Sequence, residues 1–187
     1  KGKRLLQIER DWIWYKAWSR YAWKANRKRE DEIIYWRKLL AEKFGCSVAD
    51  GKKILTAYEE TGEIAPKLLR RFGITDGNRQ TLTLGMLMTQ LINPYRYGLF
   101  TLLYDAEAPE GEMLLDYADK EWKDIKHAGE TPVEVIDKVT SNGFNAMYNN
   151  ISLVFDVKKN KPEFERLKKD ISCYYILAQH FEAKVNA

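Results

Sequence analysis

The spacing of apolar residues predicts a first helix over residues 5–25, a stretch without proline or glycine. On a helical wheel its apolar residues fall on two opposite faces, separated by a polar stripe. A helix that is apolar on two sides must lie inside the fold or offer one side to a partner or ligand. The first face holds Leu5, Ile8, Trp12, Tyr15 and Trp23, the second holds Trp14, Trp18 and Tyr21, and the polar stripe holds Glu9, Lys16 and Arg20.

The next two helices are predicted from their periodicity and from the residues at their ends. One runs from about residue 30 to residue 44 and ends at Gly45, because glycine readily adopts the left-handed conformation that follows a helix. Ser47 is the predicted N-cap of the following helix, and Asp50 completes a variant capping box. We expect that helix to end near Thr61-Gly62. The buried face of the first of these helices consists of Ile33, Trp36, Leu40 and Phe44.

A less regular part of the chain follows. A short helix over residues 65–72 and a turn at residues 75–78 lead to a further helix that ends before Asn93-Pro94. Residues 93–130 contain several prolines and glycines and many aromatic side chains, with a short helix expected over residues 114–125. Long irregular segments in compact domains are often functional or lie at an interface.

The last part of the chain predicts two long helices. Thr131, Pro132 and Glu134 have the identities expected of an N-cap, a first helical residue and the partner in a capping box. Apolar positions continue to about Val154, and a polar turn at residues 158–161 follows. The final helix has a heptad spacing, so the two helices should pair as an antiparallel hairpin. Its apolar residues are Phe164, Leu167, Ile171, Tyr174, Ala178, Phe181 and Val185.

These patterns predict an all-α fold: a multi-helix bundle that ends in a long antiparallel helical hairpin and contains one irregular, aromatic-rich segment. We expect a single helical domain over residues 1–187, divided into N-terminal helices (1–92), the irregular segment (93–130) and the hairpin (131–187). The sequence begins with lysine rather than methionine, so we expect a fragment of a longer protein. No apolar stretch approaches the roughly 18 residues of a membrane span, so no membrane partner is expected.

Charge and chemistry narrow the possible functions. The 31 basic and 27 acidic residues are interspersed, and the basic runs at residues 27–29 and 158–161 fall in predicted turns, which we interpret as solvated connectors. Nucleic-acid binding is therefore the weakest hypothesis.

The sequence offers no metal-binding motif: Cys46, Cys173, His127 and His180 lack metal-ligand spacing, so we predict no metal and no cofactor. No nucleophile or phosphate-binding motif occurs, and we assign no catalytic residue. Asp116, Asp119 and Glu121 are interpreted as surface charges, the first two paired with Lys120 and Lys123.

The tryptophans remain the strongest feature of the sequence. Trp12, Trp14, Trp18 and Trp23 lie within the first 25 residues, and we favour core or inter-domain packing for them over direct ligand contact. Arg20 lies among these aromatic residues and should pair with a buried carboxylate. These five residues are our candidates for an inter-domain interface.

The run ERDWIWYKAWSRYAWKANRKREDEIIYWRKLLAEKFG resembles a helical segment that follows the catalytic barrel in α-glucuronidase-like and related bacterial glycoside hydrolases. The stretches AYEETGEIAPKL, YGLFTLLYDAEAPEG, TPVEVIDKV and EFERLKKDISCYYILAQHFEAKV look like later parts of the same region. The resemblance implies a carbohydrate context, namely the breakdown of plant polysaccharide or glycan by a periplasmic or secreted protein. It also implies acidic catalytic residues on a barrel that this chain lacks.

Two hypotheses follow from the resemblance and the residues. The first is an accessory or scaffold helical domain of a glycoside hydrolase, which packs on the catalytic domain of the same polypeptide. In this hypothesis Arg96, Tyr97 and Tyr104 lie at the rim of the active site, where an oligosaccharide would bind. The alternative is a free-standing helical protein-interaction module that uses one aromatic face of the first helix.

Overall fold

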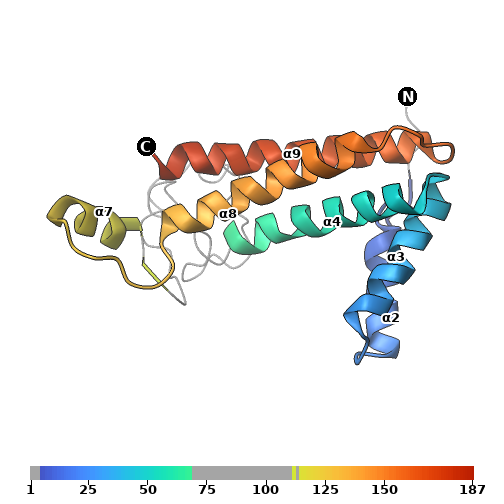
Figure 1. Ribbon diagram of the computed structural model, residues 1–187, viewed down its shortest axis with the longest axis horizontal. Helices are drawn as coiled ribbons and strands as arrows, with labels where there is room; N and C mark the ends of the chain where they lie inside the picture. The colour runs from blue at the N-terminus through green and yellow to red at the C-terminus, as the bar shows by residue number, and fades with distance from the viewer. Residues whose placement is uncertain (1–4, 69–110, 113) are drawn as a thin grey trace.

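The structure, a computed structural model, describes residues 5–68, 111, 112 and 114–187, and each regular element in these ranges is helical (Figure 1). This confirms the predicted all-α fold. None of the described helices is both long enough and apolar enough to cross a membrane. The elements are α1 (Gln7–Arg10), α2 (Trp12–Trp23), α3 (Arg29–Phe44), α4 (Val48–Leu68), α7 (Leu114–Lys123), α8 (Pro132–Phe144), the π-helical turn η2 (Asn145–Asn150), the 3₁₀ turn η3 (Ile151–Leu153) and α9 (Lys161–Val185).

Three long helices form the body of the described fold. α4, α8 and α9 lie along its long axis, α2 and α3 extend from one end, and α7 lies beyond the other (Figure 1). The start of α8 packs against the end of α9, whereas η2 and η3 pack against the start of α9, so α8 and α9 form the expected antiparallel hairpin. Gly143 makes close packing possible, because a Cβ atom there would lie 3.1 Å from the Tyr175 ring.

Two groups of buried side chains hold these helices together. The first joins α3, α4, the η2 and η3 turns and the first half of α9, and the second joins the end of α4, α8 and the end of α9. Both α4 and α9 contribute to both groups, so these two helices connect them. The first group centres on Trp36, Leu40, Phe44, Ile54, Ile151, Phe164 and Ile171, and the second on Ile64, Leu68, Val135, Ile136, Val139, Ala178 and Phe181.

The predicted helix end at Gly45 and the predicted helix start at Thr131 are confirmed. Gly45 follows α3 with φ +63°, and the Phe44 carbonyl accepts hydrogen bonds from the backbone N–H groups of Lys158 and Lys159, at 3.1 and 2.9 Å. The Thr131 hydroxyl accepts a 3.2 Å bond from the N–H of Glu134, whose carboxylate accepts a 2.9 Å bond from the N–H of Thr131. These contacts satisfy backbone groups that a helix end leaves unpaired.

Two predicted boundaries were wrong. The first helix is interrupted at Asp11, which closes α1 and opens α2 with a non-helical ψ of 26°. α4 continues through Thr61-Gly62 to Leu68, so the helix expected over residues 65–72 begins as part of α4, and its remainder lies outside the described residues. Ile64 and Leu68 are almost fully buried in the second group, and this burial outweighs the cost of roughly 1 kcal/mol for glycine inside a helix.

Candidate functional site

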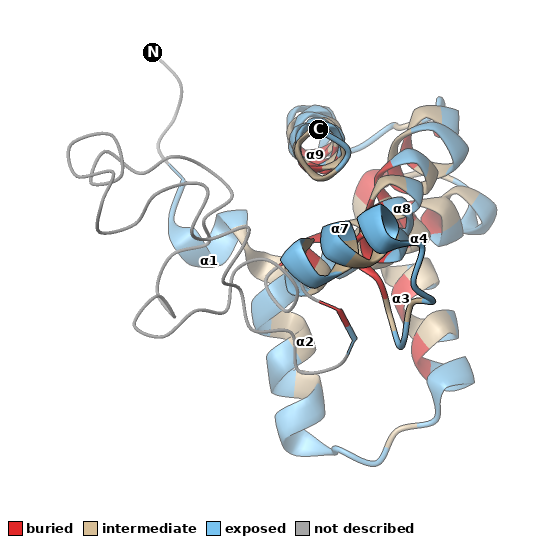
Figure 2. Ribbon diagram, turned by 90° about the vertical axis from the view of Figure 1, so that its left-hand side faces the viewer, coloured by how far each residue is buried: buried red, intermediate tan, exposed pale blue. Residues whose placement is uncertain are grey.

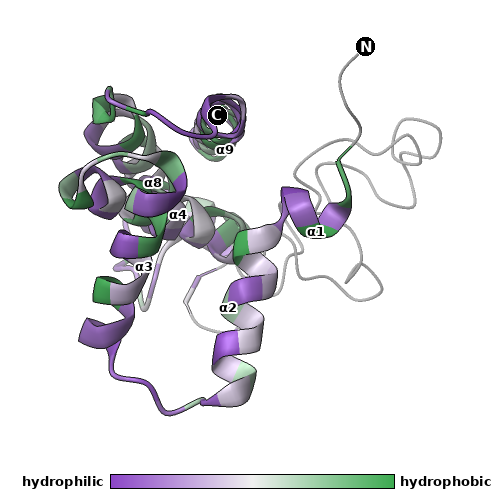
Figure 3. Cartoon of the chain, turned by 90° about the vertical axis from the view of Figure 1, so that its right-hand side faces the viewer, coloured by the Kyte–Doolittle hydropathy of each residue, from purple (hydrophilic) through white to green (hydrophobic). Residues whose placement is uncertain are grey.

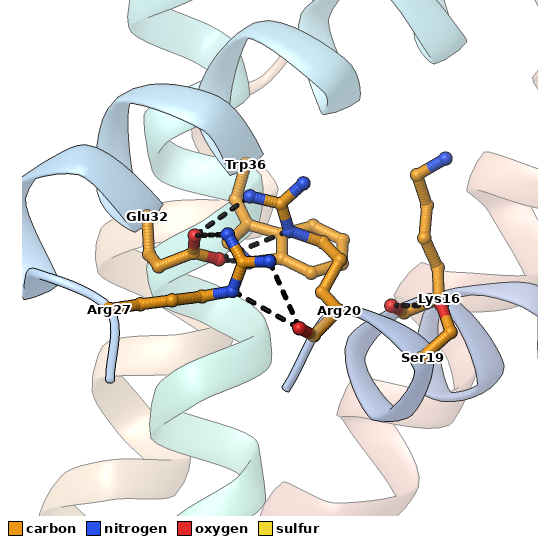
Figure 4. Close-up of polar contacts among 6 residues, drawn as sticks. All are labelled: Lys16, Ser19, Arg20, Arg27, Glu32 and Trp36. Carbon is orange, nitrogen blue, oxygen red and sulfur yellow. Dashed lines mark hydrogen bonds and ion pairs between the residues drawn. The ribbon is translucent and has the colours of Figure 1, made fainter. Parts of the chain in front are cut away.

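The position of α2 depends on Glu32, a carboxylate at the start of α3 that is only 2% exposed. Arg20 of α2 donates to both oxygens of Glu32, at 2.7 and 3.2 Å, and the Trp36 indole N–H donates at 3.2 Å (Figure 4). Arg27 adds a 3.3 Å contact to Glu32 and donates to the Arg20 carbonyl at 3.0 and 3.1 Å. The predicted pairing of Arg20 with a buried carboxylate is confirmed.

The same contacts stabilise the charged forms of both partners. The hydrogen bond from Arg20 lowers the pKa of Glu32 and outweighs the opposing effect of burial. The bond to Glu32 likewise raises the pKa of Arg20, whose guanidinium lies 3.4 Å from the centre of the Tyr35 ring. Arg20 therefore serves to hold α2 against α3 and is committed to contacts within the chain.

A second set of contacts fixes the other end of α2. The Trp12 indole N–H donates to Glu163 of α9 at 2.5 Å, and Glu163 also pairs with Lys43 of α3 at 2.9 Å. The Lys43 ammonium in turn lies 4.6 Å from the centre of the Trp12 ring. Trp12 thus packs on the first core group and links three helices, which confirms core packing for this one of the four tryptophans.

The remaining aromatic residues of α2 are exposed in the described part of the chain. The side of α2 that contacts the core runs through Ile13, Ala17 and Arg20, between the two apolar faces of the helical wheel. No residue of α2 is fully buried, and Figure 2 shows this helix in pale blue and tan only. The exposed fractions are 55% for Trp14, 66% for Trp18, 43% for Tyr21 and 89% for Trp23.

We call Trp18 and Tyr21 the α2 aromatic face, and Trp14 lies next to it. The rings of Trp14 and Trp18 lie 5.6 Å apart, and Trp14 also meets Tyr15 edge-to-face at 5.0 Å. A shallow hollow of about 370 Å³ lies beside this face, lined by Ala17, Trp18, Tyr21 and Ala22. Large exposed aromatic side chains gathered around an apolar hollow are typical of surfaces that bind another protein domain.

A larger groove of about 780 Å³ lies between the α1–α2 segment, α4 and α9. Its walls combine aromatic rings with charged groups. Its lining includes Arg10, Asp11, Trp14, Tyr58, Glu163, Arg166, Asp170 and Tyr174. Asp11 accepts two hydrogen bonds from Arg10, at 2.8 and 2.6 Å, and Arg166 donates to the Arg10 carbonyl at 3.2 Å. Burial raises the pKa of the Tyr58 hydroxyl, which therefore stays protonated and can donate.

A third polar group surrounds His127, in the connection between α7 and α8. Glu112, which is 5% exposed, accepts bonds from Lys120, from the Ala128 N–H at 2.6 Å and from His127 Nδ1 at 2.6 Å. The other ring nitrogen of His127 lies 2.7 Å from Glu121, and Tyr117 stacks on the ring with centroids 4.5 Å apart. In the described ranges, no three His, Cys, Asp or Glu side chains are placed to hold a metal ion.

The charges of this group are strongly coupled. The hydrogen bond from Lys120 is the main reason that the pKa of Glu112 falls to about 2, with Ala128 and His127 adding to the effect. Hydrogen bonds to Glu121 and Glu112 raise the pKa of His127. The arrangement favours a charged imidazolium between two carboxylates, which ties α7 to the residues on either side of it.

The predicted site residues have different outcomes. Arg96, Tyr97 and Tyr104 lie outside the described residues, so their role at a rim stays a prediction. Lys123 pairs with Asp119 at 2.7 Å, as expected. Lys120 pairs with Glu112 instead of Asp116. Glu121, interpreted as a surface charge, contacts His127. Of the basic run 27–29, Arg27 and Lys28 lie in the connection between α2 and α3, drawn in hydrophilic colour in Figure 3, and Arg29 is the first residue of α3. The interpretation of the run as a solvated connector is wrong for Arg27, whose side chain is 18% exposed and contacts Glu32.

No protein-family model and no curated protein matches this sequence. Among the solved structures that match is one described as a "GH138 enzyme targeting pectin rhamnogalacturonan II", which aligns with 99% of this chain at 48% sequence identity and a TM-score of 0.77. The chain is similar to a helical part of a glycoside hydrolase. It spans only 22% of the length of that enzyme. This match supports the predicted relationship to glycoside hydrolases, whereas the finer resemblance to α-glucuronidase-like enzymes stays a prediction.

Proposed function

We propose that this chain is a helical accessory region of a glycoside hydrolase that acts on a pectic polysaccharide, and that it packs on a catalytic domain formed by other residues. The observation that carries the proposal is the match of nearly the whole chain, at 48% identity, to about a fifth of an enzyme described as targeting pectin. The finer resemblance to α-glucuronidase-like enzymes would place an acidic sugar at the cleaved bond. A periplasmic or secreted location would suit such a substrate.

The α2 aromatic face is the surface we assign to the contact with the catalytic domain. Burial of an exposed tryptophan or tyrosine at a domain interface removes a large apolar area from water, at roughly 25 cal/mol per Å². Trp18 and Tyr21 are both well exposed and flank an apolar hollow, while α2 itself is held in place by Glu32 and Glu163. A helix that is already positioned by contacts within the chain, and has an exposed aromatic face, suits a fixed interface.

Residues 93–111 retain the role expected from the sequence. We propose that Arg96, Tyr97 and Tyr104 contribute hydrogen-bonding and stacking groups at the rim of the catalytic site. Substituting Arg96 and Tyr97 in the longer enzyme should then lower turnover while leaving the unfolding temperature unchanged.

The docking proposal is tested by the double substitution Trp18→Ala and Tyr21→Ala in the longer enzyme that carries this chain. Loss of the interface should lower the unfolding temperature and turnover of rhamnogalacturonan II, and should increase proteolytic cleavage between the helical and catalytic parts. Trp122→Ala is the matched control, because Trp122 is a tryptophan of α7 that is 89% exposed. If the double variant and Trp122→Ala have the same unfolding temperature, turnover and proteolytic cleavage, the α2 aromatic face is not part of the interface. Hydrolysis of pectin by this chain alone would overturn the accessory role.

A further inference from the structure

The groove between the α1–α2 segment, α4 and α9 is separate from the hollow beside Trp18 and Tyr21. Its volume of about 780 Å³ lies within the range of roughly 300–1,000 Å³ typical of sites for small ligands. Three residues one turn apart on α9, Arg166, Asp170 and Tyr174, form one of its walls. Trp14 of α2 and Tyr58 of α4 also line it, so rings from three helices face the same space.

Several polar groups in the groove retain unused hydrogen-bonding capacity. Arg166 has five N–H donors, and its one hydrogen bond within the described chain goes to the Arg10 carbonyl at 3.2 Å. Asp170 and the Tyr58 hydroxyl make no hydrogen bond or ion pair with a described residue. A guanidinium, a carboxylate and a phenol can together donate to and accept from neighbouring hydroxyl groups.

The charges that line the groove are balanced. Asp11 is neutralised by Arg10 and Glu163 by Lys43, which leaves Arg166 and Asp170 with opposite charges. A phosphate or a polyanion would gain little net attraction from such a surface. A neutral ligand rich in hydroxyl groups fits better, particularly one with an apolar face for Trp14 or Tyr174.

We propose that this groove binds a pyranose residue of an oligosaccharide, with ring hydroxyls on Arg166, Asp170 and Tyr58 and an apolar ring face on Trp14 or Tyr174. This inference rests on the proposed function, because a pectic substrate makes such a residue available. The groove would hold a part of the polysaccharide away from the bond that is cleaved. It would therefore contribute to binding of the polymer rather than to chemistry.

The test is a calorimetric and NMR titration of the 187-residue chain with oligosaccharides released from rhamnogalacturonan II, in parallel with neutral gluco-oligosaccharides. We expect saturable binding, with shifts confined to residues of the groove, and a loss of affinity of about tenfold or more for Arg166→Gln and for Asp170→Asn. Lys169→Gln is the matched control, because Lys169 is exposed on the same helix and does not line the groove. Binding of both sugar families would show that ring hydroxyls are recognised, and binding of the pectic set alone would narrow the ligand to that class.

Circular dichroism and thermal unfolding establish that each variant is folded, and Arg166→Lys provides a second, milder substitution that keeps the charge but lacks the planar fork. Absence of saturable binding by the folded chain would overturn the proposal, as would wild-type affinity in both groove variants. The outcome is separate from that of the docking test, because Trp18 and Tyr21 do not line the groove. A failed titration together with a disrupted W18A/Y21A enzyme would reject the sugar site and leave the accessory function standing.

Discussion

Glu32 shows how a single buried carboxylate can position a helix. Isolated burial of its charge would be unfavourable, but two arginines and the Trp36 indole supply the hydrogen bonds that replace water. Replacing the carboxylate by an amide removes the negative charge that Arg20 and Arg27 share and one of its two acceptor oxygens. The substitution Glu32→Gln should therefore reduce the free energy of unfolding by about 2 kcal/mol in urea denaturation. Glu42→Gln, an exposed position on the same helix, is the control and should change it by less than about 0.5 kcal/mol.

His127 makes a different, pH-dependent prediction. Its pKa is raised above the ordinary value of 6.5, first by the hydrogen bond to Glu121 and then by that to Glu112, so the folded chain binds the proton more tightly than the unfolded chain. The stabilisation is complete below about pH 6.5 and is lost as the pH rises through the folded-state pKa. The difference in unfolding free energy between the wild type and His127→Gln should shrink from about pH 5 to about pH 9. A difference that does not vary with pH would contradict this.

His180 is the control for that titration. Burial lowers the pKa of His180, so its contribution to stability has the opposite dependence and grows as the pH rises through its range. His180→Gln should consequently change the pH profile in the reverse direction from His127→Gln. The two profiles, measured by chemical denaturation in matched buffers, separate the effect of each side chain from the general titration of the protein.

At the scale of elements, two glycines of α4 have opposite roles. A Cβ atom at Gly51 would lie 2.2 Å from the Arg37 carbonyl and 3.0 Å from the Ala41 Cβ, so α3 and α4 approach closely only because this position is glycine. Gly62 has no atom within 4 Å of the corresponding position. Gly51→Ala should destabilise the chain by about 1–3 kcal/mol through overpacking. Gly62→Ala should stabilise it by about 0.5–1 kcal/mol through helix propensity. Thermal unfolding of the pair checks both signs, and equal shifts would exclude the packing role of Gly51.

The accuracy of the sequence predictions also differs among elements. The ends marked by Gly45, Ser47 and Thr131 were predicted because their contacts are local: the Asp50 N–H donates to the Ser47 hydroxyl at 3.0 Å, for example. The continuation of α4 past Gly62 was missed because it depends on burial of Ile64 against α8 and α9. The His127 group was missed because Glu112 lies 15 residues earlier, and no helical period relates the two positions.

At the scale of the whole molecule, stability is unevenly distributed. α4, α8 and α9 share two groups of buried side chains, whereas α2 has no fully buried residue and depends on the contacts to Glu32 and Glu163. Hydrogen exchange by mass spectrometry of the chain alone should therefore find the amides of α2 exchanging well before those of α9. In the longer enzyme, docking of the α2 aromatic face should slow exchange in α2. Protection of α2 equal to that of α9 in the chain alone would contradict this order.

The π-helical turn η2 has a consequence for how this hairpin tolerates changes in length. A π turn accommodates one more residue than an α turn, and it lies between the α8 residues of the second core group and Ile151 of the first. Deleting one residue from 145–150 would rotate Ile151 and Val154 by about 100° relative to α8, away from their present neighbours. Val135, Ile136 and Val139 would keep their register. The turn therefore separates two phases of the helix, and a single-residue insertion or deletion within it should disrupt the packing of the first core group while leaving the second in register.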